Sequence, residues 1–295
     1  MSIKHQVKNV LSQTTMDSLF NVRSEQTGKE LIQTQKAFSI TDHRIFLKEH
    51  VQHSKPLVLE SECTDVSSKW TNEYLTQTTQ DGLEVDIDIA PPSTSGFFAD
   101  TREDRARLAI EEKVVPFVTL LDGSCKPSPD HYIYLQQQSW PFDIVFPNLS
   151  KDLKTCSSYL LREMSNCSLA KILWLGCSPT RSQLHFDRKD NFICQMCGKK
   201  EILLFAPEDT GFLYQKEACN EDDLFNNRFS SINPNMSPKS FREKYPHASK
   251  ASATRIILNP GDVLFVPKLW WHLVSSTPDH TRSINIMVNM FFEAI

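Results

Sequence analysis

The chain has 295 residues, of which 40% are hydrophobic and 10% aromatic. That composition supplies a substantial core and excludes global disorder. The formal net charge of −4 argues against a broadly basic surface for nucleic acid, although a local basic groove stays open. No apolar run is long enough to span a membrane, so we expect no membrane partner.

The eight cysteines lack the spacing of a disulfide framework, and we therefore expect a cytoplasmic and/or nuclear protein. Residues 1–16 contain two lysines and no acidic residue, which leaves a targeting segment open. Cys194 and Cys197 form the one CxxC motif. Because no second pair could complete a zinc site, we interpret both as small buried apolar residues.

The N-terminal part of the chain has the weaker signals. Residues 1–40 are polar and mixed, and we expect a helical or irregular extension with helices near 6–20 and 28–36. After residue 40 the spacing of apolar residues is clearer and predicts three helices and one strand. These are helices at 41–51, 69–77 and 115–123 and a strand at 83–90. Asp86 and Asp88 share one face of that strand, which we interpret as the solvated side of an edge strand.

After residue 150 the pattern changes to short strands separated by Gly- and Pro-containing turns, which predicts a barrel or jelly roll decorated by helices. The predicted strands are 171–177, 183–187, 191–197, 199–207, 254–260, 262–267, 271–276 and 283–292. Together with a strand at 130–138 they would form a core over about 130–292. Residues 224–251 form a long insertion, and such insertions often cover a binding site. We expect one domain over 41–295.

The segment "QLHFD" places a histidine and a carboxylate on one face of a strand, because His185 and Asp187 are two residues apart. An interior carboxylate without a partner is costly, and a divalent cation removes that cost. His272, in "LFVPKLWWHLV", offers a third ligand from a distant strand. Two histidines and one carboxylate are the usual ligands of non-haem Fe(II) oxygenases. Zinc on the same ligands would give a hydrolytic site instead.

Lys200 favours the oxygenase, because a lysine inside a barrel must meet an anion or lose its charge. If the metal chelates one end of 2-oxoglutarate, the far carboxylate of this cosubstrate needs such a cation. The neighbouring Lys199 points to the opposite face. Four further residues could orient the cosubstrate through hydrogen bonds. They are Tyr134, Ser182, Asn191 and Asn285.

At these residues the sequence resembles the Jumonji-C family of Fe(II)- and 2-oxoglutarate-dependent oxygenases. The likeness runs from about Pro56 to Phe292, and includes "HFDRKDNFICQMCGKKEILLFAPED" from residue 185 and "NPGDVLFVPKLWWHLV" from residue 259. It is greatest for the small single-domain protein hydroxylases, of the type of factor inhibiting HIF. The segment "IAPPSTSGFFADTREDR", which begins at residue 89, resembles the Jumonji-C lysyl hydroxylase of GTP-binding proteins.

The resemblance implies a cupin-like double-stranded β-helix, mainly β with flanking helices. It implies Fe(II) on His185, Asp187 and His272 and 2-oxoglutarate on Lys200, with O2 as the second cosubstrate. The implied activity is hydroxylation of a protein side chain, with a lysyl residue favoured and a GTP-binding protein as one candidate substrate. A tRNA-modifying oxygenase, an N-methyl-lysine demethylase and a non-catalytic binding protein stay open as alternatives, as does the oligomeric state.

Overall fold

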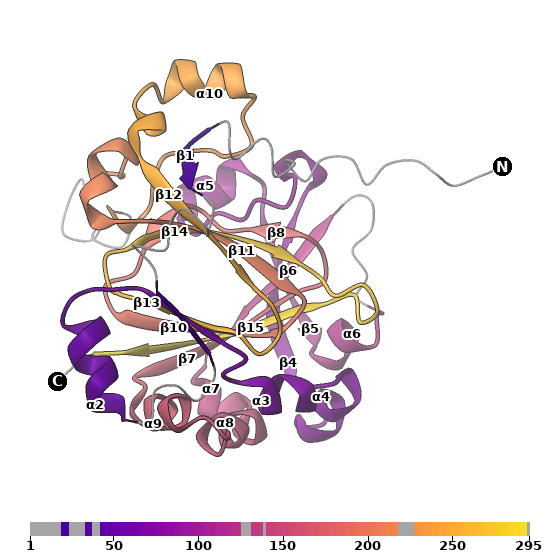
Figure 1. Ribbon diagram of the computed structural model, residues 1–295. Coiled ribbons are helices and arrows are strands. Elements are labelled where there is room, and N and C mark those ends of the chain that lie inside the picture. The colour runs from indigo at the N-terminus through magenta and orange to yellow at the C-terminus, as the bar shows by residue number, and fades with distance from the viewer. Residues whose placement is uncertain are drawn as a thin grey trace.

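The computed structural model describes residues 19–23, 33–36, 42–124, 131–137, 140–217 and 227–293. Within these residues the chain forms two β-sheets that face each other, with helices packed against the outer side of the larger sheet (Figure 1). This arrangement confirms the mainly β architecture with a jelly-roll core and flanking helices.

The smaller sheet has the strand order β1-β12-β11-β14-β8, and β9 pairs with β14 beside β8. All its pairs are antiparallel except β1 with β12. The strands are β1 (Asn21–Arg23), β8 (Thr180–Arg181), β9 (His185–Phe186), β11 (Lys199–Phe205), β12 (Ser252–Leu258) and β14 (Trp271–Thr277). Two of the predicted metal ligands therefore belong to one sheet.

The larger sheet has the order β2-β3-β13-β10-β15-β7-β6-β4-β5, and its pairs are antiparallel except β2 with β3. Its strands are β2 (Gln33–Lys36), β3 (Leu57–Glu60), β4 (Glu84–Ala90), β5 (Glu111–Pro116), β6 (Tyr132–Gln137), β7 (Ala170–Gly176), β10 (Asp190–Cys197), β13 (Val263–Val266) and β15 (Asn285–Phe292). The sheet supplies the wall that faces the smaller sheet across the interior.

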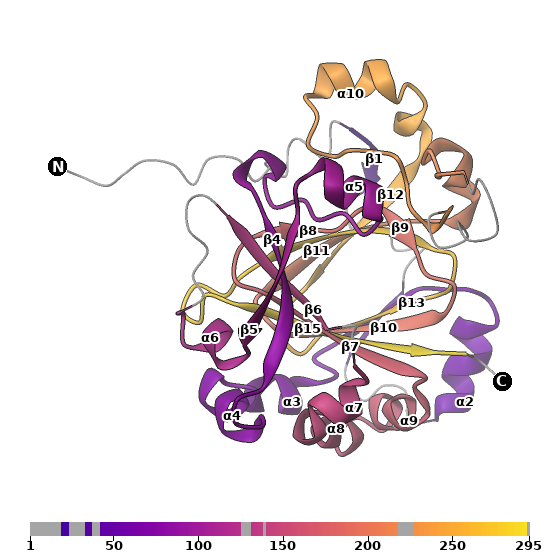
Figure 2. The ribbon, with the colours of Figure 1, turned by 180° about the vertical axis from the view of Figure 1, so that it is seen from behind.

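Most helices lie along the far side of the larger sheet, and α5 and α10 lie near the smaller one (Figures 1 and 2). The helices are α2 (His43–Phe46), continued by the π-helical turn η1 (Leu47–Val51), α3 (Thr64–Lys69), α4 (Asn72–Thr78), α5 (Arg102–Arg107), α6 (Val118–Leu121), α7 (Phe142–Val145), α8 (Pro147–Lys154), α9 (Tyr159–Cys167) and α10 (Pro238–Lys244). Short 3-10 turns are η2 (Pro92–Thr94), η3 (Pro207–Phe212) and η5 (Ala248–Lys250). Among the described residues, every helix is too short or too polar to cross a membrane.

The packing between the sheets orients the β11 side chains that matter for the site. β11 pairs with β14 so that Ile202 lies opposite Val274 and Lys200 lies opposite Ser276. Ile202 and Val274 belong to an apolar cluster built from both sheets. Since side chains two residues apart on a strand share a face, Lys200 points into the same interior. It is 1% exposed, whereas Lys199 is on the surface, as predicted.

Tertiary pairing overrides three helix predictions made from local periodicity. The predicted helix at 28–36 is wrong at its end, because residues 33–36 form β2 beside β3. The helix predicted at 115–123 is shortened to Val118–Leu121, since the preceding residues pair with β4 as β5. The one predicted at 69–77 is interrupted at Trp70, between α3 and α4. The helix predicted near 6–20 falls almost entirely outside the described residues.

Asp88 corrects the interpretation of β4 as an edge strand with a solvated acidic face. β4 lies between β5 and β6, and Asp88 is 8% exposed while Asp86 is exposed. The Arg105 guanidinium donates to both Asp88 carboxylate oxygens at 2.6 and 2.9 Å, and Gln136 Nε2 donates to one at 3.2 Å. A paired, buried carboxylate thus fastens α5 to β4.

Cys194 and Cys197 are both buried and free, as expected. A register shift between Gln195 and Cys197 brings both cysteines into the same apolar cluster, although the regular alternation of a strand would separate them. Burial raises the pKa of Cys197 to about 11. The thiol is therefore protonated at neutral pH, as expected for a buried structural cysteine.

Candidate metal and cosubstrate site

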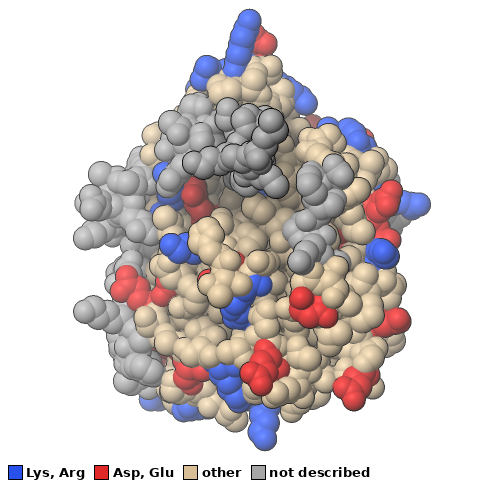
Figure 3. All heavy atoms as spheres, turned by 90° about the vertical axis from the view of Figure 1, so that its right-hand side faces the viewer, with Lys and Arg blue, Asp and Glu red and all other residues tan. Residues whose placement is uncertain are grey.

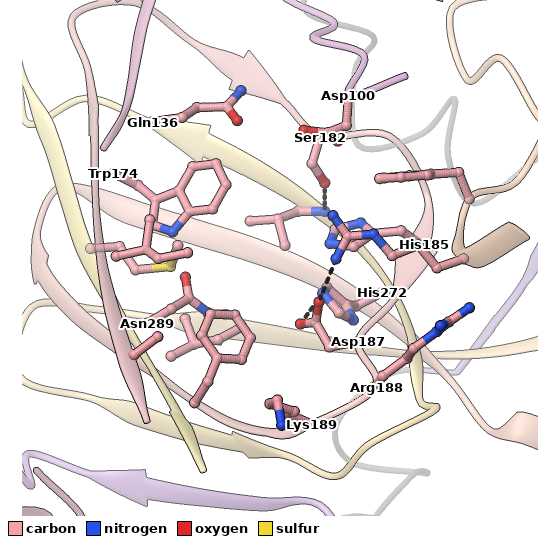
Figure 4. Close-up of a pocket in the computed structure, with 18 of the residues that line it drawn as sticks. Asp100, Gln136, Trp174, Ser182, His185, Asp187, Arg188, Lys189, His272 and Asn289 are labelled. Carbon is pink, nitrogen blue, oxygen red and sulfur yellow. Dashed lines mark hydrogen bonds and ion pairs between the residues drawn. The ribbon is translucent and has the colours of Figure 1, made fainter. Parts of the chain in front are cut away.

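A cavity of about 520 Å³ lies between the two sheets. Aromatic side chains form much of its wall, and Figure 4 shows the polar residues that project into it. The aromatic residues are Phe98, Tyr134, Trp174, Phe229 and Phe291. All three predicted metal ligands line this cavity as well. The predicted ligand set therefore opens onto a space large enough for a small cosubstrate and part of a substrate.

His185, Asp187 and His272 meet because β9 pairs with β14 and places His185 directly opposite His272. Asp187 follows β9, and its Oδ2 lies 3.6 Å from His272 Nε2. One ligand atom from each of the three residues lies within 4.8 Å of the others. The structure thus brings the three predicted ligands together, at a spacing that suits coordination of one ion.

Backbone hydrogen bonds fix the tautomers of both histidines. His185 Nδ1 donates to the Gln183 carbonyl at 2.7 Å, and His272 Nδ1 donates to the Trp270 carbonyl at 3.1 Å. Each ring therefore keeps an unprotonated Nε2, which is a metal-ligand atom. Burial, reinforced by the neighbouring His272, holds the pKa of His185 well below its usual range. Both features suit neutral imidazoles that bind a divalent cation.

Two side chains hold the Asp187 carboxylate from outside the triad. Asn191 Nδ2 donates to Asp187 Oδ2 at 3.3 Å, and Arg228 Nη1 lies 3.7 Å from Asp187 Oδ1. Asn191 is fully buried and is not among the cavity-lining residues, so it contacts a metal ligand rather than the cavity. The donor set of two imidazoles and one carboxylate fits Fe(II), with Asn191 orienting the carboxylate.

Lys200 is buried in the interior without a counter-charge among the described residues. Its Nζ donates to Ser276 Oγ at 2.5 Å, and burial lowers its pKa to about 7. Lys200 does not belong to the cavity wall. It precedes Ile202 by two residues on β11, and Ile202 packs with the wall residue Val274. An anion that reached Lys200 would restore its charge. The residue therefore fits the far carboxylate of a dicarboxylate cosubstrate.

The buried Lys200 makes stability depend on pH in a defined direction. The folded chain releases the proton near pH 7, whereas an unfolded lysine keeps it to about pH 10.4. Between these values the unfolded chain binds more protons, so the free energy of unfolding rises with pH, by at most about 1.4 kcal/mol per unit. Urea unfolding of the metal-free protein from pH 7 to 9 tests this. Lys200→Met should remove the rise, and equal slopes in both proteins would contradict it.

Two other predicted cosubstrate residues, Ser182 and Tyr134, line the cavity. Ser182 Oγ accepts a hydrogen bond from the Val274 backbone N–H at 3.0 Å, which holds the hydroxyl beside β14. Tyr134 is 6% exposed, and burial raises its pKa above the usual range, so the phenol stays a neutral hydrogen-bond donor. Both residues remain candidates for orienting the cosubstrate.

The structure places Asn285 outside the cavity wall. Its Nδ2 donates to the Lys199 and Thr277 carbonyls, both at 3.0 Å, and the side chain fastens the β10–β11 turn rather than lining the cavity. Asn289, four residues along the same strand, lines the cavity instead. Its Oδ1 is buried without a hydrogen-bond partner among the described residues. Asn289 is therefore a candidate site residue that the sequence prediction missed.

Three more cavity residues were not predicted individually: Asp100, Trp174 and Arg228. Arg228 and Phe229 belong to the insertion predicted at 224–251, and Phe229 forms a β-bridge with His185. The expectation that this insertion reaches the site is confirmed for these residues, while its first residues lie outside the described chain. In the sequence, Trp174 is simply an aromatic residue within a predicted strand, and Asp100 is an acidic residue after a short apolar stretch. Neither pattern indicates a functional site.

Fold and site together define the class of protein: a cupin-like barrel with a two-histidine, one-carboxylate centre. A family model described as "Cupin-like domain" matches residues 43–295. The chain belongs to this family of cupin-like, Jumonji-C-type proteins.

Named relatives match the chain over different shares of its length. HSPB1-associated protein 1 of Rattus norvegicus is 34% identical over 40% of this chain, and the chain spans only 24% of that protein. tRNA wybutosine-synthesizing protein 5 of Homo sapiens is 30% identical over 84% of this chain and 74% of that protein. Lysine-specific demethylase 8 of Danio rerio is 29% identical over 78% of this chain and 52% of that protein.

Proposed function

We propose that the protein is an Fe(II)- and 2-oxoglutarate-dependent oxygenase that acts on a C–H bond of a macromolecular substrate. The observation that carries the proposal is the convergence of two histidine Nε2 atoms and Asp187 on an aromatic cavity. A buried lysine without a counter-charge among the described residues supports 2-oxoglutarate as the cosubstrate. Zinc hydrolysis would leave Lys200 without a role.

In this proposal His185, Asp187 and His272 hold Fe(II), and Lys200, Ser182 and Tyr134 hold 2-oxoglutarate. The bound iron and cosubstrates supply the oxidising chemistry, with decarboxylation of 2-oxoglutarate to succinate. Backbone carbonyls that accept from Nδ1 of both histidines orient each Nε2 toward the ion. The aromatic walls of the cavity limit the access of water to the reacting groups.

We propose a modified tRNA as the substrate, in preference to a lysyl side chain of a protein. The relative that aligns over 84% of this chain is named for tRNA wybutosine synthesis, and another is named as a lysine demethylase. The preference for protein lysyl hydroxylation, drawn from the sequence, has no support from these names. Aromatic walls with Arg188, Lys189 and Arg228 at the cavity suit a base and its phosphates.

On the face drawn in Figure 3, the described residues form no broad basic surface that would attract RNA. Lys and Arg side chains on this face are interspersed with Asp and Glu, in keeping with the net charge of −4. RNA contacts would therefore concentrate at the cavity, which Arg188, Lys189 and Arg228 line, although Lys189 is ion-paired with Glu293 and Arg228 with Asp187. Such binding would depend on only a few phosphate contacts and weaken moderately with salt.

Mass spectrometry of products distinguishes the candidate reactions. The protein is incubated with Fe(II), 2-oxoglutarate and O2 together with either a tRNA fraction or a protein fraction, and Asp187→Ala is the inactive control. We expect a gain of one oxygen atom in tRNA nucleosides. The same gain confined to peptides would establish a protein hydroxylase, and formaldehyde release a demethylase. If neither Fe(II) nor 2-oxoglutarate raises the melting temperature, the protein is a non-catalytic binding protein.

A further inference from the structure

Asp100 places a carboxylate in the cavity that the metal and cosubstrate site does not use. In the view of Figure 4, Asp100, Gln136 and Ser182 lie along the upper edge of the cavity and Asp187 lies below them. Asp100 lies outside the group of residues whose ligand atoms converge on one point. Its carboxylate is thus available to a ligand other than the metal.

Within the described part of the chain, the Asp100 carboxylate has no hydrogen-bond or ion-pair partner. The two nearby arginines are engaged with other carboxylates: Arg105 with Asp88, and Arg228 with Asp187. Burial raises the pKa of Asp100 to about 6. Asp100 is partly exposed, and it lines the cavity. A carboxylate that is partly desolvated without a partner is costly, and a cationic ligand in the cavity would remove that cost.

Three aromatic rings pack together in the wall of the cavity that Asp100 also lines. Phe98 and Tyr134 pack with ring centroids 5.3 Å apart, and Tyr134 and Trp174 pack at 5.6 Å. The three rings line the same cavity as Asp100. Aromatic faces attract ammonium and guanidinium groups, most strongly where water is excluded. A carboxylate beside aromatic walls is therefore complementary to an organic cation with an apolar stem.

We propose that Asp100 binds a cationic nitrogen of the substrate, an ammonium or guanidinium group, and so selects substrates that carry one. This inference rests on the proposed function, because it assigns part of the same cavity to the substrate. The cation can come from a protein side chain or from an aminoalkyl group on a modified nucleoside. Asp100 is a specificity-determining residue in either case.

Matched small probes test the charge preference directly. Binding is measured by ligand-observed NMR titration of N-acetyl-lysine methylamide against N-acetyl-norleucine methylamide, and of 5-aminomethyluridine against uridine. The wild-type protein should bind at least one cationic probe about tenfold more tightly than its neutral partner. A preference within the lysine pair would assign the cation to a protein side chain, and a preference within the uridine pair would assign it to a modified nucleoside.

The variant Asp100→Asn keeps the size of the side chain and removes its charge, and it should lose the tenfold preference. Asp86→Asn on β4 makes the same charge change at an exposed position and should keep it. An unchanged melting temperature of Asp100→Asn excludes misfolding, and Asp100→Glu should recover part of the preference if the fold is disturbed. An equal preference in the wild type and Asp100→Asn, or none in the wild type, would overturn the inference. If the wild-type protein prefers the cationic probe but forms no succinate, the proposed function is overturned and the inference about Asp100 is not.

Discussion

We expect replacement of Asp187 with alanine to abolish 2-oxoglutarate turnover and to weaken Fe(II) binding by at least about 100-fold. The reason is that Asp187 is the one carboxylate among the three converging ligand atoms. Its loss also removes the ion pair between Asp187 and Arg228. Metal binding is measured by titration of the metal-free protein, and turnover by succinate formation. His185→Ala should have the same effect, because its Nε2 faces the same point.

The matched control for this result keeps the carboxylate and changes its reach. Asp187→Glu should retain more metal binding than Asp187→Gly, since a longer carboxylate can still approach the ion. All variants should melt within a few degrees of the wild type, because the site lies at the cavity wall and outside the large apolar clusters. Wild-type rates of succinate formation in Asp187→Ala would remove the triad from the account.

We expect replacement of Lys200 with alanine to raise the dissociation constant of 2-oxoglutarate by roughly two to three and a half decades. The ammonium is 1% exposed, and its one partner among the described residues is the Ser276 hydroxyl. Without it the far carboxylate would be buried unpaired, which typically costs about 3–5 kcal/mol. Calorimetric titration of the Fe(II)-loaded protein under exclusion of O2 measures the effect.

Two variants on the same strand control for the Lys200 result. Lys199→Ala removes an exposed lysine one residue away and should leave 2-oxoglutarate binding almost unchanged. Lys200→Arg should recover part of the affinity, since the planar guanidinium is larger than the ammonium that the pocket encloses. If Lys199→Ala lost more 2-oxoglutarate affinity than Lys200→Ala, Lys199 would be the cosubstrate cation and the assignment of Lys200 would be wrong.

The strand periodicity of the sequence predicts much of the site. A period of two places His185 and Asp187 together and separates Lys200 from Lys199, and the structure shows both arrangements. The same period cannot choose between Asn285 and Asn289, which lie on one face of β15. Four residues along a strand are about 13 Å, and only the register with the neighbouring strands places Asn289 at the cavity.

Residues that reach the site from loops and distant segments are not predictable from periodicity. Asp100 lies between η2 and α5, and Arg228 follows a break in the described chain. Their positions depend on long-range packing, such as the bridge from Phe229 to His185. Similarly, residues 33–36 become a strand only because β3 offers a free edge. Local sequence pattern predicts the three candidate metal ligands, whereas tertiary contacts decide which residues form the wall of the cavity.

The central claim is that one site holds Fe(II) and 2-oxoglutarate together. Calorimetric titration with 2-oxoglutarate, under exclusion of O2, tests it when the wild-type protein is compared before and after loading with Fe(II). We expect clearly tighter binding to the loaded protein and no gain on loading in Asp187→Ala, because one end of the cosubstrate would bind the ion that the triad holds. Equal affinity with and without Fe(II), or no binding in either state, would contradict the account.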